Sequence, residues 1–419
     1  MLCGRMHRTG IYASITSCCR FFICHSTVTL AVQPGEMTIR NARIIADPQA
    51  GLWLDEVHWQ DGAVVDTPAD TEAPKGEALD CGGDLVVPGF IDLHTDALEG
   101  RLMPRPGVDW PGRAAMLAHD SDVIGAGVTT TFNAVAIGTS SRKPERLALI
   151  EPFVQAVQSA RADRVLRADH RLHFRCEVTD PLMPKALEAL LERVQPDAMS
   201  IMDHAPGKRQ VRDIEDMVQW MVAQRGETVG QARIFAADFV RESEENGAAR
   251  SVLVAEHARR LNISLATHDD ETAEHIAFAK TIGAHYAEFP VTRVAAEAAV
   301  SSGLPVTMGA PNVVRGQSSG GNADARALIH DGLVAALLSD YVPSSQLHAV
   351  ARLIDEGMDA ARAVSLVTDG PAGIAGLDDR GKLLPGKRAD FVRLSLHGGI
   401  AQVKGVWVAG QLVFGEPQP

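Results

Sequence analysis

Histidine and carboxylate residues recur at the ends of short apolar segments along this 419-residue chain. The first segment ends with His94 and Asp96, and residues at this spacing in a β-strand project on the same side. A later segment carries His173, Arg175 and Glu177 at the same spacing. Imidazoles and carboxylates gathered in one place are costly to desolvate without a cation. The pattern therefore indicates a site for Zn²⁺, Mn²⁺ or a similar divalent metal.

Residues of the same types follow other apolar segments. They are Asp203, His204, His268, Asp269, Asp270 and Asp340. Taken singly, such a residue is more often a loop hydrogen-bonding group or a helix cap than a ligand. Asp269 and Asp270 precede a helical segment and are natural capping candidates, and His173 could equally be a buried core histidine. Only the convergence of the whole set favours a metal.

The segments that carry these residues alternate with helical segments. Strands are expected within residues 84–96, 128–136, 172–178, 198–204, 263–270, 285–290, 305–311 and 335–341. Helical crossovers between strands imply a parallel sheet, and this many strands favours closure into a (β/α)8 barrel, an α/β fold. Barrels of this kind carry their active sites at the carboxyl ends of the strands, so the candidates are expected to meet at one mouth.

After residue 36, the two ends of the chain have the pattern of short β-strands. We expect residues 37–85 and 378–419 to form a small β-sandwich domain, with the barrel spanning residues 86–377. Residues 1–36 contain four of the six cysteines and no acidic residue before Glu36. A basic, acid-free leader is typical of a signal or transit peptide. We favour instead a start assigned too early, with Met37 as the true beginning, and place this segment outside the fold.

Composition narrows the class of protein further. A hydrophobic fraction of 46% supports a large core. The formal net charge of −13 argues against general binding to nucleic acid or to an anionic membrane. After residue 36 the only cysteines are Cys81 and Cys176, which is typical of the reducing cytoplasm.

Longer motifs resemble a known family. VVPGFIDLHTD and the late LPGKRADFVRLS are similar to the amidohydrolase superfamily, in which a metal-dependent (β/α)8 barrel lies beside a small β-sandwich. More narrowly, HTDALEGRLMPRPGVDWP, FRCEV, MDHAPGKRQ, THDDET, GAPNVVRGQSSGGN and LSDYVPSS resemble the triphosphate diphosphatases of the carbon–phosphorus lyase pathway. The resemblance extends from about Met37 to the C-terminus.

The resemblance implies a metal-dependent hydrolase that converts α-D-ribose 1-methylphosphonate 5-triphosphate into the 5-phosphate and pyrophosphate. It implies one or two divalent ions, with Zn²⁺ favoured over Mn²⁺, Fe²⁺ or Ni²⁺. The expected ligands are His94, Asp96, Glu177, His204 and His268. Asp340 matches the superfamily aspartate that accepts a proton from water and passes it to the leaving group.

The chain departs from the superfamily pattern at the first strand. Relatives usually carry two histidines there, whereas this chain has His94 followed by Asp96. It therefore stays open whether Asp96 binds a metal directly or through water. Many relatives also use a carboxylated lysine to bridge two ions, and here Glu177 is the better bridging candidate.

Basic residues beside the motifs are candidates for the phosphate groups of a substrate. They are Arg105, Lys208 and Arg315. A guanidinium can donate two hydrogen bonds to one phosphate group. The Gly-rich run at 316–321 could present backbone N–H groups, although it lacks the Gly-Lys-Ser/Thr of a P-loop. The expected partner is a small phosphorylated sugar, and self-association stays open.

Two other functions remain as alternatives. The first is hydrolysis of a C–N bond, as by a deacetylase or a cyclic amidase, which has little use for several cations beside the metal. The second is a barrel that binds a partner without catalysis. A nearly complete ligand set together with Asp340 argues against this second alternative.

Overall fold

A computed structural model describes residues 37–66, 77–105, 107–138, 144–209, 213–318 and 321–415. The expected leader at residues 1–36 and two positions of the Gly-rich run lie outside the described residues. Eight parallel strands form one sheet in chain order, which confirms the predicted α/β barrel. They are β8 (Phe90–Thr95), β9 (Val128–Ile137), β10 (Asp169–Glu177), β11 (Ala198–Met202), β12 (Ser264–His268), β13 (Tyr286–Glu288), β14 (Val306–Gly309) and β15 (Ala336–Leu338).

The first and last strands of this sheet meet and nearly close the barrel. Thr95 and Asp340 form a parallel bridge between the two strand ends. Nearby, the buried carboxylate of Asp92 accepts the backbone N–H of Ser339 at 2.9 Å and its hydroxyl at 2.5 Å. The last strand thereby aligns its carboxyl end with that of β8.

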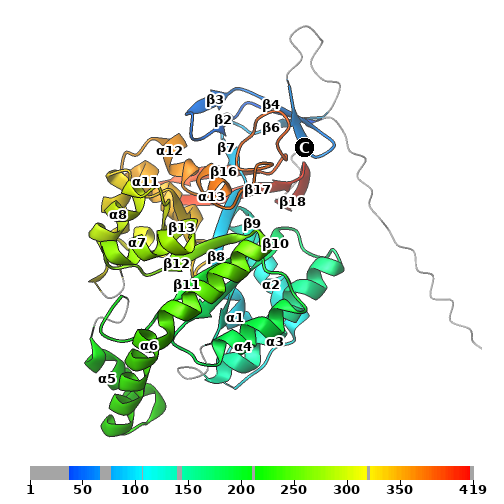
Figure 1. Cartoon of the computed structure of the whole chain (residues 1–419). Coiled ribbons are helices and arrows are strands. Elements are labelled where there is room, and N and C mark those ends of the chain that lie inside the picture. Colours follow the sequence, from blue (N-terminus) through cyan, green and yellow to red (C-terminus); the bar gives the residue numbers. More distant parts are fainter. Residues whose placement is uncertain are drawn as a thin grey trace, which may run out of the picture. The chain divides into compact units, whose positions relative to one another are not determined.

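Helices connect the barrel strands and lie outside them (Figure 1). They are α1 (Ala97–Leu102), α2 (Gly112–Gly125), α3 (Pro144–Ala162), α4 (Met183–Leu191), α5 (Ile214–Arg225), α6 (Val229–Leu261), α7 (Ala273–Ile282), α8 (Arg293–Ser301), α9 (Ala310–Arg315), α10 (Ala325–His330), α11 (Ser345–Asp355), α12 (Ala360–Ser365) and α13 (Asp369–Ile374). None of the described helices combines the length and the hydropathy needed to cross a bilayer.

Strand β10 shows why the barrel positions a polar site. Phe174 and Cys176 are fully buried in a core cluster with residues of α3 and α4, so they face the helices. His173, Arg175 and Glu177 alternate with them and therefore face the barrel interior. The alternation predicted from the sequence is present, and it separates a hydrophobic outer face from a charged inner face.

Two further sheets are present, and the larger one combines strands from both ends of the described chain. The four-stranded sheet has the order β5 (Ala63–Val65), β4 (Val57–Gln60), β1 (Met37–Arg40) and β6 (Glu77–Asp80). The six-stranded sheet has the order β18 (Gln411–Gly415), β17 (Ile400–Val408), β16 (Phe391–His397), β7 (Leu85–Pro88), β2 (Arg43–Asp47) and β3 (Leu52–Leu54). Trp59, Phe391 and Trp407 pack in a common core between these strands.

A short link joins the six-stranded sheet to the barrel. Gly89 lies between β7 and β8, and a Cβ atom at this position would lie 2.2 Å from Oγ1 of Thr129. Only glycine fits so close to β9, so the Pro-Gly of the VVPGF motif fixes where the first barrel strand begins beside β9.

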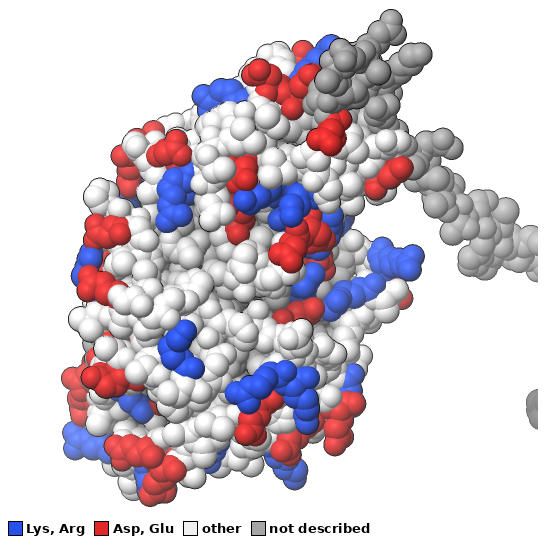
Figure 2. All heavy atoms as spheres, turned by 45° about the horizontal axis from the view of Figure 1, so that its top comes forward, with Lys and Arg blue, Asp and Glu red and all other residues white. Residues whose placement is uncertain are grey.

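The molecular surface in Figure 2 shows acidic and basic side chains interspersed among uncharged residues.

Candidate metal centre and active site

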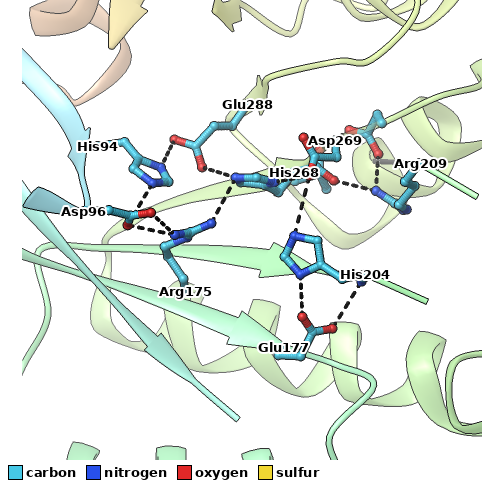
Figure 3. A network of polar contacts seen from close by, with 11 residues as sticks. His94, Asp96, Arg175, Glu177, His204, Arg209, His268, Asp269 and Glu288 are labelled. Atoms are coloured by element: carbon cyan, nitrogen blue, oxygen red, sulfur yellow. Dashed lines mark hydrogen bonds and ion pairs between the residues drawn. The ribbon is translucent and has the colours of Figure 1, made fainter. Parts of the chain in front are cut away.

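Three groups of histidine and carboxylate side chains gather at the carboxyl ends of the barrel strands. Within each group the ligand atoms all lie within 4.8 Å of one another. The groups are His94, His173 and Glu288; His204, His268 and Asp269; and His94, Asp96 and Asp340. The predicted convergence at one mouth is therefore present. Figure 3 shows the members that it labels, which are His94, Asp96, His204, His268, Asp269 and Glu288.

The first group is buried and fits a metal ion. Nδ1 of His94 lies 3.0 Å from Oε1 of Glu288. Nδ1 of His173 lies 3.0 Å from the carbonyl oxygen of Leu93 and donates to it, so the lone pair is on Nε2. Neither His94 Nδ1, nor His173 Nε2, nor the carboxylate oxygens of Glu288 complete a hydrogen bond among the described residues. Buried polar atoms left in this way fit a bound cation.

The protonation of this group agrees with the same interpretation. Burial lowers the pKa of His173 to about 4, so its imidazole is neutral and can offer a lone pair. Burial also disfavours the charged form of His94, but the Glu288 and Asp96 carboxylates together outweigh it and raise the pKa of His94. A divalent ion that replaces the proton on His94 would be attracted by the same carboxylates.

The second group is organised by a carboxylate behind it. Oε2 of Glu177 lies 2.5 Å from Nδ1 of His204, and Oε1 accepts the His204 backbone N–H at 3.2 Å. Thr179 donates to the same Oε1 at 2.6 Å. This arrangement turns Nε2 of His204 toward Asp269, whose Oδ2 is 3.6 Å away. Carboxylates that hold the far nitrogen of a ligand histidine are common at metal sites.

His268 and Asp269 complete the second group. Nδ1 of His268 lies 2.9 Å from Oδ2 of Asp269. On the other side of the ring, Nε2 of His268 lies 3.9 Å from Oε2 of Glu288. His268 therefore belongs to the second group and also lies beside Glu288 of the first group, as Figure 3 shows.

Asp340 lies at the junction of the first and last strands. Its carboxylate shares the third group with His94 and Asp96. Burial raises the pKa of Asp340, and the nearby Asp96 carboxylate acts in the same direction. A carboxylate whose pKa is raised toward neutrality is suited to accept and return a proton.

Three residues at the strand ends adopt a left-handed backbone conformation without being glycine. Asp269, Phe289 and Asp340 have φ values of 56°, 54° and 56°. They follow β12, β13 and β15, respectively. This conformation is disfavoured for side chains such as phenylalanine, and strained backbone of this kind concentrates at functional sites.

Arg175 connects two of the three groups. Its Nη1 donates to both oxygens of Asp96 at 2.7 Å, and its Nη2 lies 3.5 Å from Nε2 of His268. The sequence places Arg175 between His173 and Glu177 but assigns it no role. In the structure its guanidinium lies among the candidate metal ligands (Figure 3).

The three predicted phosphate-binding residues all follow barrel strand ends. Arg105 is exposed after β8, and Arg315 is the exposed last residue of α9 after β14. Lys208 follows β11, where its Nζ lies 2.7 Å from Oδ2 of Asp203 and also donates to Ser243. The described contacts join none of the three to the metal groups, and their roles stay predictions.

The capping alternatives for the aspartates can be compared with the observed helix starts. Thr272 is the N-cap of α7 and accepts the backbone N–H of His275, so neither Asp269 nor Asp270 caps that helix. Asp270 instead accepts Thr267 Oγ1 at 2.5 Å and Arg209 Nη1 at 3.0 Å. Ser344, rather than Asp340, precedes α11.

Sequence reasoning missed part of the site. The residue pattern does not single out Glu288, it leaves a core role open for His173, and it favours a capping role for Asp269. A signal existed for Glu288, because it ends the sixth barrel strand in the same way as His268 ends the fifth. Since a strand of only three residues gives almost no periodicity, Glu288 was hard to distinguish from a loop residue.

Comparison with known proteins finds one matching family model and several similar proteins. A model of the amidohydrolase family matches residues 191–414. The chain is 37% identical over 349 residues to the alpha-D-ribose 1-methylphosphonate 5-triphosphate diphosphatase of Escherichia coli strain K12, covering 83% of this chain and 92% of the relative. It is 26% identical over 390 residues to an imidazolonepropionase of Deinococcus deserti, covering 84% of this chain and 90% of that protein.

Solved structures share the fold at low identity. A 5-methylcytosine deaminase from Klebsiella pneumoniae superposes with a TM-score of 0.59 at 16% identity, covering 91% of this chain and 99% of that one. A dihydropyrimidinase from Brevibacillus agri gives 0.56 at 12% identity, covering 91% and 95%. With the family model matching more than half of the sequence, and with its barrel and histidine–carboxylate mouth, the chain belongs to the amidohydrolase family.

Proposed function

We propose that the protein is a metal-dependent diphosphatase that hydrolyses α-D-ribose 1-methylphosphonate 5-triphosphate to the 5-phosphate and pyrophosphate in phosphonate catabolism. The observation that carries the proposal is the convergence of three histidine–carboxylate groups with Asp340 at the barrel mouth. The identity of 37% to a diphosphatase of that name supports this choice of substrate. The two expected products are a sugar 5-phosphate and free pyrophosphate.

The residues at the mouth fit one or two divalent ions. Of the predicted ligands, His94, Asp96, His204 and His268 lie in these groups, and the geometry adds His173, Asp269 and Glu288. Glu177 instead contacts Nδ1 of His204 and would hold that ligand from behind. A divalent ion bound there would supply positive charge to phosphoryl oxygens and lower the pKa of a water molecule toward neutrality. Since imidazoles and carboxylates together suit Zn²⁺, this ion is our first choice, with Mn²⁺, Fe²⁺ and Ni²⁺ as the alternatives.

Asp340 is the proposed proton carrier. Its carboxylate lies in the third group, and burial raises its pKa. In the proposed reaction Asp340 accepts a proton from the attacking water and returns it to the leaving group. The new bond joins the water oxygen to the phosphorus nearest the sugar, and the bond between that phosphorus and the pyrophosphate oxygen breaks.

The substrate-binding cations are the next part of the proposal. Arg105, Lys208 and Arg315 follow strand ends on the side of the barrel that carries the site. Arginine and lysine at such positions would neutralise the phosphate chain of the substrate. The small phosphorylated sugar, and not a nucleic acid or a membrane, is the proposed partner, and the proposed location is the cytoplasm.

Hydrolysis in isotopically labelled water tests the position of attack. The proposal predicts that heavy oxygen from water enters the sugar 5-phosphate and that the released pyrophosphate is unlabelled, as read by mass spectrometry. Label in pyrophosphate would mean that water attacks the next phosphorus and would overturn the proposed geometry.

Hydrolysis of a C–N bond is the second candidate. It is favoured by the 26% identity to an imidazolonepropionase. A panel of cyclic amides and acylated amines, tested with the same metal-loaded protein, distinguishes the two chemistries. Turnover of an amide without release of pyrophosphate from the triphosphate would favour this second candidate.

A further inference from the structure

The guanidinium of Arg175 is a buried cation that neither the ligand set nor the proposed proton carrier accounts for. We propose that Arg175 is a catalytic residue that donates hydrogen bonds to the oxygens of the phosphoryl group under attack. The inference rests on the proposed phosphoanhydride chemistry and deepens it. It makes Arg175 a determinant that favours phosphoryl over C–N substrates in this barrel.

The position of Arg175 supports this role. The residue lies on β10 between His173 and Glu177, and its side chain faces the barrel interior. Nη1 contacts Asp96 in one metal-binding group, while Nη2 lies 3.5 Å from His268 in another. A group bound by both sets of ligands would therefore lie against this guanidinium (Figure 3).

The guanidinium has donors that the described residues do not use fully. Arg175 is only 9% exposed, and its buried Nε has no hydrogen-bond partner among the described residues. The contact of Nη2 with His268 is at the long limit for a hydrogen bond. A buried arginine N–H without an acceptor costs free energy of folding, unless a ligand accepts its hydrogen bond.

The charge of Arg175 is permanent in this setting. A guanidinium stays protonated in folded proteins, and here both oxygens of the Asp96 carboxylate lie 2.7 Å from its Nη1. The hydrogen bonds from Nη1 to both oxygens of Asp96 also limit the movement of the Arg175 side chain. A fixed cation requires little reorganisation when negative charge develops beside it.

Phosphoryl chemistry explains why such a cation is useful. During attack at phosphorus, negative charge is spread over three equatorial oxygens, and an arginine that contacts them commonly contributes a factor of about 10³ to 10⁵ in rate. An amide offers only one developing oxyanion. A guanidinium between two candidate metal groups therefore fits a phosphoryl substrate better than an amide.

The first experiment replaces the guanidinium in the full-length protein. We expect Arg175→Met to lower kcat for pyrophosphate release roughly a thousandfold while leaving the metal content, read by elemental analysis, unchanged. Arg175→Lys keeps the charge but loses the planar fork, so an intermediate rate is expected. The matched control is Arg171→Met, which removes an arginine at the opposite end of the same strand, where it pairs with Asp169.

A second pair of measurements separates contact with substrate from positioning of Asp96. In Arg175→Gly, added guanidinium salt at non-denaturing concentrations should restore part of kcat in a saturable manner, because it replaces the missing donors. In the Asp96→Asn background, Arg175→Met should still reduce the rate. Absence of rescue, or no further loss in that background, would overturn the proposal and leave Arg175 a positioning residue.

Binding of ribose 5-phosphate, whose phosphoryl group corresponds to the one under attack, gives a readout that does not need turnover. By calorimetry on metal-loaded protein, we expect Arg175→Met to bind ribose 5-phosphate roughly tenfold or more weakly than the unaltered protein. If the unaltered protein releases no pyrophosphate from the triphosphate, the proposed function fails. The Arg175 proposal is then decided by binding alone, and equal affinities would overturn it.

Discussion

The backbone N–H of Asp340 donates a 2.9 Å hydrogen bond to the carbonyl oxygen of His94. In return, the Asp340 carbonyl accepts the backbone N–H of Asp96 at 2.7 Å. The proposed proton carrier is thus attached through its own backbone to the strand that presents two candidate metal ligands. The backbone hydrogen bonds that close the barrel therefore also bring Asp340 next to His94 and Asp96.

Asp340→Asn tests the proton-transfer role directly. The amide keeps the size of the side chain and leaves the backbone bonds to β8 intact, so folding and metal content should be unchanged. Because an amide cannot accept the proton, kcat should fall by roughly 10² to 10⁴. Asp216→Asn on the exposed face of α5 is the control. A near-normal rate for Asp340→Asn, measured by pyrophosphate release, would remove Asp340 from the mechanism.

Glu288→Gln tests the part of the metal site that the structure added. Glu288 is fully buried beside His94 and His173, and its replacement removes the negative charge that attracts a cation. We expect divalent-ion affinity, measured by competition with a chelator, to fall roughly tenfold or more. Glu297→Gln on α8, whose side chain is 52% exposed, should bind metal normally. Equal affinity in the two variants would exclude Glu288 from the site.

Arg315→Ala tests the predicted phosphate contact. Because Arg315 is exposed at the end of α9, its loss should not disturb the fold. An interaction made equally with substrate and transition state would raise KM, about tenfold for one such contact, and change kcat little. Arg193→Ala is the control, since Arg193 precedes β11 at the opposite end of the barrel. An unchanged KM for the triphosphate would place Arg315 outside the substrate site.

Asp120 gives a stability prediction remote from the metal groups. Burial would raise the pKa of this carboxyl, but bonds from His170, Ala168 and Arg167 outweigh it and lower the pKa to about 2, from an ordinary value of 3.8. A lowered folded-state pKa contributes stability that is present above the unfolded pKa and is lost as the pH falls toward the folded value. The shift corresponds to roughly 2 kcal/mol at neutral pH.

Asp120→Asn should therefore lower the free energy of unfolding by roughly 2 kcal/mol at pH 7, as measured by urea denaturation. The difference from the unaltered protein should persist down to about pH 4 and shrink below it. Asp122→Asn serves as the control on the same helix, where the side chain of Asp122 is 38% exposed. A difference that stayed constant below pH 4 would contradict the assigned ionic role.

The strand order and the mouth of the barrel could be predicted because long apolar strands carry their own signal. Strand β10 shows this best, since its alternation separates Phe174 and Cys176 from the charged inner residues. His204 follows the fourth barrel strand and His268 ends the fifth, in agreement with the strand order expected from the sequence. The strand that holds Glu288 has three residues and offers no comparable periodicity.

Pairings between distant segments could not be predicted in the same way. The contact of Glu177 with Nδ1 of His204 depends on how two neighbouring strands align, and no residue pattern within either strand specifies it. The same holds for the contact of Arg175 with Asp96, which lie 79 positions apart. Sequence chemistry identified these residue types, whereas only the register of the sheet shows which of them meet.

The central claim is tested most directly by pyrophosphate release from α-D-ribose 1-methylphosphonate 5-triphosphate. The full-length protein is stripped of metal and then supplied separately with Zn²⁺, Mn²⁺ and Mg²⁺. We predict that release is absent from the stripped protein and restored by a divalent ion, with Zn²⁺ the first choice. Folded protein that binds these ions and still releases no pyrophosphate with any of them would contradict the proposed function.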